Sequence, residues 1–242
     1  RAAAERGVFA ARGGRKKTSL RVISPMGVAA TIVGRADRVD GGEKDEAAIV
    51  NYRLASSAFS VNEAYHGISL ALIGAMAGIG QEGMKPVAGF NVQMVRKLCD
   101  KMPDVEGKEK NLDLATKPRG IFDEAVVRGL DKGVEQGWSE VVAAYLGKEG
   151  TLRYRRSTDV ASGEELAGLM KHVEKRMGEM VDEILAGKVE VSPYLLRLRS
   201  PCANCGYRDV CRFEVTENRY RPLADRDREA ILKEVAEEAR QP

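Results

Sequence analysis

The chain has 242 residues, of which 43% are hydrophobic and 31% charged, and its formal net charge is +3. This balance is typical of a globular protein with one large domain or two small ones, and no apolar run is long enough to span a bilayer, which favours a soluble protein. A net charge of +3 does not by itself indicate nucleic-acid binding. The basic residues are clustered, however, in three groups: Arg12, Arg15, Lys16 and Lys17; Arg153, Arg155 and Arg156; and Arg197, Arg199, Arg208 and Arg212.

The four cysteines and the lack of a signal peptide indicate a reducing, cytoplasmic compartment. The chain begins with Arg1 rather than Met, and we therefore expect a fragment whose natural N-terminal part is absent. We expect residues 1–18, rich in Ala, Arg and Gly, to be a linker or the end of an upstream helix.

The first half of the chain predicts strands followed by a helix. Residues 19–23 and 28–40 have the pattern of two antiparallel strands that turn at residues 25–27, and the apolar run 47–50 predicts a third, buried strand. A long helix is expected to follow, with Asn62 as its N-cap, Glu63 in its first turn, and its end at Gly78 or Gly80. Residues 85–95 alternate as a further strand does.

The second half predicts mainly helices. Residues 99–117 are charged and irregular, as in a surface insertion, and short helices are expected from residues 118–130 and 133–145. The clearest helix spans residues 163–186: Ser162 and Glu165 form a capping box, apolar residues recur at helical spacing, and Gly187 stands at the C-cap. A charged, exposed helix is expected within residues 224–242.

Three cysteines near the C-terminus form the most specific motif. Cys202, Cys205 and Cys211 have the spacing C-x2-C-x5-C, and thiolates this close are typical ligands of a soft metal or an iron–sulfur cluster. Cys99 lies in an unrelated position, and we interpret it as a lone, partly buried thiol rather than as a ligand. Zinc stays an alternative, although His66 and His172 lack finger-like spacing.

A second motif carries a family resemblance. The segment "VGRADRVD" (residues 33–40), a turn, and "AAIVNYRL" (residues 47–54) resemble the heart of the RecB-like branch of the PD-(D/E)xK nucleases. With the helix 163–186, "CGYRDVCRF" and "NRYRPL", residues 19–223 resemble the C-terminal nuclease domain of AddB-type subunits of bacterial AddAB helicase–nucleases. The resemblance implies an α/β, restriction-endonuclease-like core, with a small mixed sheet flanked by helices and the cysteine motif at residues 202–211. It also implies DNA ends and an AddA-type subunit as partners, in double-strand-break processing.

The resemblance assigns five catalytic positions, and four of them depart from the family pattern. Asp37 matches the first carboxylate. Asn51 stands at the second carboxylate, Arg53 at the lysine, and Ala71 and Ala75 at the glutamine and tyrosine of the following helix. The family uses the carboxylates to hold Mg²⁺ and the lysine to contact the scissile phosphate. Losing such groups costs about 10²–10³ in rate apiece, so we expect a weak or inactive nuclease.

Two alternatives remain open at this point. One is an active Mg²⁺-dependent deoxyribonuclease in which acids have migrated; the candidates are Asp40, Glu43, Asp45, Glu46 and Glu63, each of which is more simply interpreted as a turn or helix-start residue. Asp40 has the opposite strand parity to Asp37 and should point away from it. The second alternative is an interaction module, held together by the metal at the cysteines, that binds a helicase partner and makes few contacts with DNA.

The resemblance also implies the roles of the cysteines and arginines. It assigns Cys202, Cys205 and Cys211 to a [4Fe–4S] cluster whose fourth ligand lies upstream of this fragment. Such a cluster would tie the end of the chain to the start of the domain and contribute to folding. The residues expected to contact DNA are Arg38, Arg53, Arg208 and Arg212.

Overall fold

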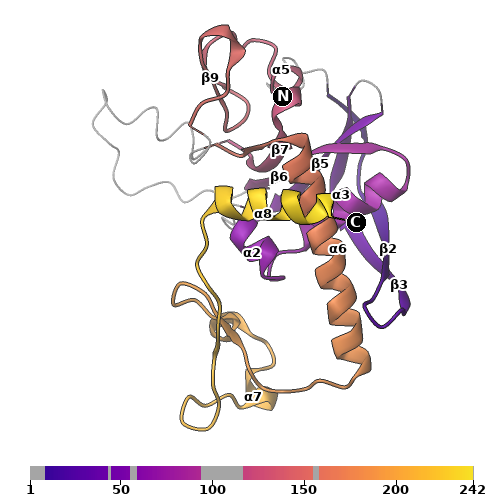
Figure 1. Ribbon diagram of the computed structural model, residues 1–242, viewed down its shortest axis with the longest axis vertical. Coiled ribbons are helices and arrows are strands. Elements are labelled where there is room, and N and C mark those ends of the chain that lie inside the picture. Colours follow the sequence, from indigo (N-terminus) through magenta and orange to yellow (C-terminus); the bar gives the residue numbers. More distant parts are fainter. Residues whose placement is uncertain (1–8, 43–44, 55–58, 94–116, 155–157, 242) are drawn as a thin grey trace.

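A mixed six-stranded sheet forms the centre of the molecule (Figure 1). The computed structural model describes residues 9–42, 45–54, 59–93, 117–154 and 158–241. The strand order in the sheet is β1-β4-β5-β6-β7-β10. These strands are β1 Ala10–Gly13, β4 Arg38–Gly41, β5 Glu46–Arg53, β6 Lys85–Gln93, β7 Arg119–Asp123 and β10 Val160–Ala161.

The sheet is antiparallel from β1 to β5, parallel between β5 and β6, antiparallel between β6 and β7, and parallel between β7 and β10. The parallel step from β5 to β6 contains two helices, α2 (Val61–Tyr65) and α3 (Ala71–Gln81). A mixed sheet that is flanked by helices is the α/β architecture expected from the sequence, so the predicted mixed sheet is confirmed.

The predicted strand 28–40 is two strands. β2 (Lys16–Ile23) and β3 (Ala29–Ala36) form a hairpin ribbon, and the chain bends at Asp37 before entering β4 of the main sheet. The bend is held by the Asp37 carboxylate, which accepts the Tyr52 backbone N–H at 2.9 Å. The predicted linker 1–18 is also wrong in its described part, because residues 10–13 pair with β4 as an edge strand and β2 begins at Lys16.

The predicted helix around residues 61–80 is broken into α2 and α3. Gly67 has φ +77°, a left-handed conformation that ends a helix. The N-cap is Ser60, whose hydroxyl accepts the Glu63 N–H, whereas Asn62 is buried and donates to Asp225 at 3.1 Å. The second helix ends at Gln81, just beyond the predicted end.

Two further predictions of helix are wrong at least in part. Residues 119–123 are strand β7, and only η1 (Glu124–Val126) and α5 (Val127–Leu130) are helical. The strand forms because Gly120 lets β6 approach: a Cβ there would lie 1.9 Å from the Gly89 carbonyl oxygen. Residues 133–145 hold no helix, and the short strands β8 (Gly137–Trp138) and β9 (Tyr145–Leu146) pair instead. The predicted insertion 99–117, with Cys99, lies outside the described residues except at its last residue.

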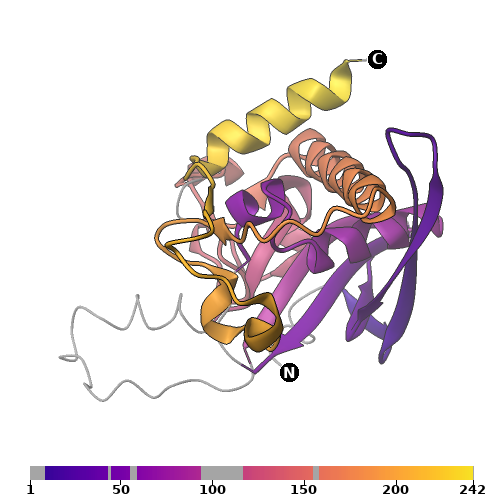
Figure 2. The same ribbon diagram turned by 90° about the horizontal axis from the view of Figure 1, so that it is seen from below.

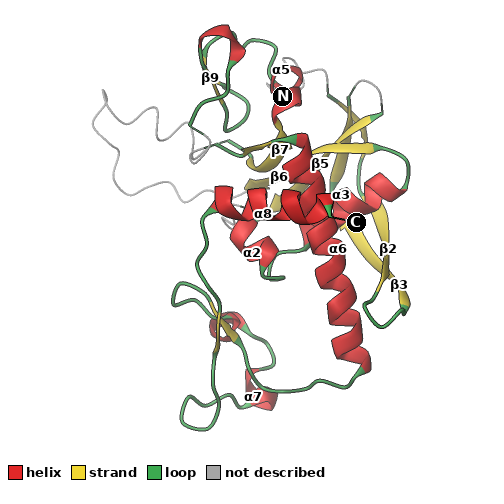
Figure 3. Cartoon of the chain, viewed as in Figure 1, coloured by secondary structure: helices red, strands yellow, loops and turns green. Residues whose placement is uncertain are grey.

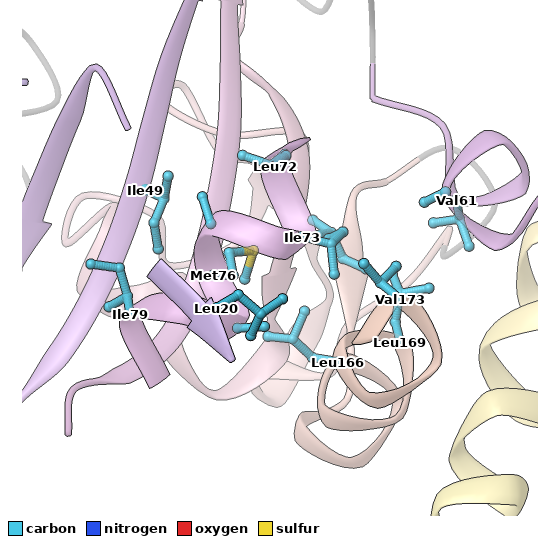
Figure 4. Packing of buried hydrophobic residues seen from close by; sticks show 14 of the residues in the cluster. Leu20, Ile49, Val61, Leu72, Ile73, Met76, Ile79, Leu166, Leu169 and Val173 are labelled. Carbon is cyan, nitrogen blue, oxygen red and sulfur yellow. The ribbon is translucent and has the colours of Figure 1, made fainter. Parts of the chain in front are cut away.

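Helices cover one face of the sheet in two layers (Figure 2). The 23-residue α6 (Gly163–Leu185) packs on α3 and β2, and its predicted capping box is confirmed. Its apolar face joins α3 and β5 in the main core, as Figure 4 shows for Ile49, Ile73 and Leu169. A second core on the opposite face contains Phe90 and Phe122.

The C-terminal helix is part of the core rather than a fully exposed helix. α8 (Arg228–Arg240) lies across α6, and its Ile231, Leu232 and Val235 are each no more than 1% exposed. Lys233, Glu237 and Arg240, among the charged residues that suggested exposure, are exposed on its outer face, as in an amphipathic helix. The domain therefore extends beyond residue 223.

A cluster of polar and aromatic side chains connects α8 to α2 and α6. The Tyr65 hydroxyl donates to Glu234 at 2.7 Å, the Tyr65 ring stacks on His172 with centroids 4.5 Å apart, and Arg226 lies over the same ring. The hydrogen bonds from Arg226 and Tyr65 lower the pKa of Glu234 to about 2. Burial, and then Glu234, raise the pKa of Tyr65.

Residues 187–223 form a lobe with little core of its own, here called the cysteine lobe. It contains strands β11 (Tyr194–Leu195) and β12 (Arg221–Pro222) and helices η4 (Pro201–Asn204) and α7 (Arg208–Cys211); the rest is loop (Figure 3). Leu196 is the one buried hydrophobic residue of the lobe. Within the described ranges, no helix is long and apolar enough to cross a membrane.

Candidate functional site

The predicted catalytic positions meet in one cavity of about 390 Å³, here called the Asp37 cavity. Asp37 comes from the bend after β3, Asn51 and Arg53 from the end of β5, and Ala71 from the first turn of α3. The full lining of the cavity is Val33, Gly34, Arg35, Asp37, Asn51, Arg53 and Ala71. Four of the five positions taken from the family pattern therefore lie together, whereas Ala75 is buried in the main core.

Local hydrogen bonds fix the two residues that stand where the family has carboxylates. Asp37 Oδ2 accepts the Tyr52 N–H at 2.9 Å, and the Asp37 N–H donates to Asn51 Oδ1 at 3.4 Å. The Asn51 side chain is thus engaged by the backbone and 4% exposed. Its amide supplies an oxygen but no negative charge, which weakens any site for Mg²⁺.

The charges around the Asp37 cavity favour an anion. One carboxylate, Asp37, is set against the guanidinium groups of Arg35 and Arg53, so the lining carries a net positive charge. Arg35 Nε lies 3.9 Å from Asp37 Oδ1, and the side chains of Arg35 and Asp37 are 60% and 23% exposed. Arg53 is exposed and forms no ion pair within the described residues. Arginine holds phosphate in two-point contacts but stays protonated and cannot act as a base.

The start of α3 adds to this electrostatic bias. Leu70 precedes the helix and offers no side-chain cap, so the first backbone N–H groups of α3 lack a side-chain acceptor beside Ala71. The positive end of the helix dipole therefore lies at the cavity wall. A glutamine at position 71, as in the family pattern, would project from this wall; alanine leaves the space open.

Sequence reasoning missed Arg35. The residue stands two positions before Asp37, so both side chains project to the same side of the extended chain. The two-residue spacing between Arg35 and Asp37 was the available signal. It would have placed the Arg35 guanidinium, a second cation besides Arg53, at the predicted site.

Arg38, a predicted DNA contact, points to the other side of the sheet. Its guanidinium is held by Asp40 at 2.8 Å and by the Tyr52 hydroxyl at 2.8 Å. Asp40 therefore points away from Asp37, as its parity predicts. The expected DNA contact of Arg38 stays a prediction.

The other acids proposed as migrated ligands do not line the Asp37 cavity in the described part of the chain. Asp45 is in a turn with φ +61°, Glu46 begins β5, and Glu63 follows the N-cap of α2. Glu43 lies outside the described residues. Asp37 is the single carboxylate among the described residues of that lining.

The three C-terminal cysteines are close in sequence but do not converge on a point. Cys202 is partly exposed, Cys205 and Cys211 are exposed, and all three are free thiols. No group of three or more histidine, cysteine or acidic side chains in the described ranges is placed to hold a metal ion. The donor set is nevertheless suited to a soft metal: Cys202 lies in the 3-10 helix η4, Cys205 is the C-cap of that helix, and Cys211 ends α7.

Arg208 and Arg212, the other predicted DNA contacts, are exposed on the cysteine lobe beside Cys211. Arg212 has φ +48° at the end of α7. Their roles, like the ligand role of the cysteines, stay predictions.

Several known proteins have sequences similar to this chain. The AddB protein of Bacillus licheniformis, one of the subunits of its ATP-dependent helicase/deoxyribonuclease, is 30% identical over 235 residues, which is 90% of this chain and 20% of that protein. The corresponding proteins of Geobacillus kaustophilus and Bacillus subtilis are 30% and 29% identical over 90% and 86% of the chain. The chain thus spans about a fifth of the length of these AddB relatives.

The family match covers the predicted catalytic positions as well as most of the core. Residues 1–212 match the PD-(D/E)XK nuclease superfamily, and this range includes Asp37, Asn51, Arg53 and the three C-terminal cysteines. The mixed sheet with helices on one face, and the cavity at the bend between β3 and β4, are the structural counterpart of that match. The chain belongs to the PD-(D/E)XK nuclease superfamily.

Proposed function

We propose that this chain is a DNA-binding, nuclease-like domain of a helicase–nuclease subunit, which holds the phosphate backbone at DNA ends without cutting it efficiently. The partner would be an AddA-type subunit that carries out the cleavage. The proposal rests on the net positive Asp37 cavity, in which one carboxylate faces two guanidinium groups. The names of the relatives support a helicase–nuclease setting.

The chemistry of the cavity supports binding over hydrolysis. Phosphodiester cleavage by this fold needs a metal to activate water and to neutralise charge that develops on the phosphate. Asp37 alone offers one charged ligand, and Asn51 is already held by a backbone N–H. Arg35 and Arg53 can instead hold a phosphate through charge-assisted hydrogen bonds.

The cysteine lobe has the properties expected of a metal-dependent element. Its 37 positions hold one buried hydrophobic side chain, Leu196, so hydrophobic burial alone gives it little stability. We propose that Cys202, Cys205 and Cys211 hold a [4Fe–4S] cluster with a further ligand, which would fix the lobe to the domain. We assign no fourth ligand among the described residues.

DNA binding is tested by the salt dependence of affinity. The full-length protein should bind single-stranded DNA with a steep slope of log affinity against log salt, because phosphate contacts release counterions. Arg53→Ala should reduce that slope by about 0.7, the value for one phosphate contact to a single strand. The matched control is Arg21→Ala: Arg21 is exposed in the β2–β3 ribbon, away from the Asp37 cavity, and should leave the slope unchanged.

No binding at low salt would contradict the proposal and would favour a module that only docks a protein partner. An unchanged slope in Arg53→Ala would contradict the role of the cavity.

The cluster is tested by anaerobic purification of the full-length protein. We expect a brown protein with about four iron and four sulfide ions, and we expect Cys205→Ser to lose both. Zinc without iron would contradict the proposed cluster.

A further inference from the structure

A second cavity, of about 530 Å³, is lined by five arginines from distant parts of the chain; we call it the arginine cavity. Its arginines come from the start of β7, from the segment before the cysteines, and from the segment before α8 together with the first residue of that helix. They are Arg119, Arg197, Arg199, Arg226 and Arg228. The acidic residues of the lining are Glu63 and Asp159, so cations outnumber anions around the cavity.

Ion pairs position most of these arginines. Arg119 makes two hydrogen bonds of 2.8 Å to Asp159, which is 5% exposed. Arg197 pairs with Asp225 at 2.6 Å, and Arg226 pairs with Glu234. A guanidinium has five N–H donors, so a paired arginine still has donors for a second anion. Such pairing holds the donors in place before a ligand arrives.

Arg199 differs from the others. It is exposed, and it forms no ion pair or side-chain hydrogen bond within the described residues. An arginine that forms no ion pair in the described part of the chain, in a cavity lining with four more arginines, raises the positive potential there. Its replacement should disturb the fold little.

A strained turn presents Arg199 to the cavity. Leu196 and Arg199 exchange backbone hydrogen bonds of 2.9 and 2.8 Å, and the two residues between them have φ +47° (Arg197) and φ +62° (Leu198). Left-handed φ at two consecutive residues with side chains costs free energy, because glycine or asparagine would be preferred there. Leu198 at the tip is 92% exposed, so burial does not compensate. Strain of this kind is commonly kept where it positions a functional group.

The two cavities lie at the same end and on the same face of the sheet. Asn51 in β5 is paired with Asn91 in β6, and Asn91 is paired with Arg119 in β7. Residues in register across neighbouring strands project to one face, and two strand spacings amount to about 10 Å. Asn51 lines the Asp37 cavity and Arg119 lines the arginine cavity, so the two cavities lie side by side. Asn91 between them is buried, and its Oδ1 lacks a hydrogen-bond partner in the described part of the chain.

We propose that the arginine cavity binds phosphates of the same DNA strand whose backbone contacts the Asp37 cavity. The strand would cross the ends of β5, β6 and β7 and continue toward the cysteine lobe, with Arg199 in direct contact with a phosphate. This inference rests on the proposed function, since it places a second contact on the same bound strand. It assigns a binding role to Arg119 and Arg199, which the family motif does not include.

The first test is the salt dependence of single-stranded DNA binding by the full-length Arg199→Ala protein. We expect the slope of log affinity against log salt to fall by about 0.7, the value for one lost phosphate contact. Arg199→Lys keeps the charge and should keep most of the slope. Arg21→Ala is again the matched control. An unchanged slope in Arg199→Ala, with Arg53→Ala still reduced, overturns this inference and leaves the proposed function standing.

The second test locates the strand directly. A photo-crosslinking residue, p-benzoylphenylalanine, is placed at Leu198, which is exposed between Arg197 and Arg199, or at Met26, which is 77% exposed at the tip of the β2–β3 ribbon. We expect DNA crosslinks from position 198 and none from position 26. Bound DNA without crosslinks from position 198 overturns the inference. Failure of the unmodified protein to bind DNA at low salt refutes the proposed function itself.

Discussion

Asn51→Asp should turn the Asp37 cavity from an anion site into a site that responds to Mg²⁺. The change places a second carboxylate beside Asp37, in a side chain that is 4% exposed. The charge of the lining then falls from net positive to neutral, because two carboxylates face Arg35 and Arg53. Without a metal, the two carboxylates repel each other and the variant should be less stable than the unmodified protein.

The size of the Mg²⁺ response follows from ligand-linked stability. A site with a dissociation constant of about 1 mM, in about 10 mM Mg²⁺, stabilises the folded state by about 1.4 kcal/mol. For a chain of this size, about 1 kcal/mol shifts the melting temperature by about 2–4 °C, so the expected rise is about 3–6 °C. The unmodified protein should show no comparable rise, since it has one carboxylate at the site.

The assay is thermal unfolding in Mg²⁺ and in EDTA, with the double variant Asp37→Ala/Asn51→Asp as control. The double variant should lose the response. A melting temperature of Asn51→Asp that rises with Mg²⁺ no more than that of the unmodified protein would contradict this prediction. A rise in the unmodified protein that Asp37→Ala removes would also contradict it, because a single carboxylate would then bind Mg²⁺.

Three further predictions concern stability. Gly168→Ala in α6 would place a Cβ 2.5 Å from the Val235 carbonyl oxygen in α8, so the free energy of unfolding measured with denaturant should fall by about 1–3 kcal/mol. Leu232→Ala, at a side chain that is 1% exposed, should lower it by about 2–5 kcal/mol. The pKa of Glu234 is lowered from 4.5 to about 2, so its ion pair stabilises the fold above about pH 5 and is lost as the pH falls toward 2. Glu234→Gln should therefore reduce the loss of melting temperature between pH 5 and pH 2.

Each of these predictions has a clear contrary result. Full stability in Gly168→Ala or Leu232→Ala would mean that α8 does not pack on α6. An identical pH dependence in Glu234→Gln would mean that its ion pair does not contribute to stability.

The features that sequence analysis predicted well have local signals. The capping box of Ser162 and Glu165 lies within four residues, and it marks the start of α6 correctly. The apolar run in β5 indicates a buried strand from its own residues, without knowledge of the strands that pair with it. The positions of Asp37, Asn51 and Arg53 came from a family motif that covers two adjacent strands, so their meeting in one cavity follows from the fold.

The features that sequence analysis missed depend on distant contacts. The sequence predicts the start of a helix at residues 119–123. These residues form a strand instead, because β6 and β10 pair with them. The burial of α8 depends on α6, about 60 residues earlier. The arginine cavity combines arginines from Arg119 to Arg228, and no spacing in the sequence brings them together. Its one local signal was the basic cluster that contains Arg197 and Arg199.

The most direct test of the central claim is digestion of linear DNA by the purified full-length protein, without any other subunit, in Mg²⁺ or Mn²⁺. We expect the protein to bind DNA and to show no cleavage that depends on Asp37. Cleavage of linear DNA that is abolished by Asp37→Ala would contradict this expectation, because the Asp37 cavity would then be an active nuclease site.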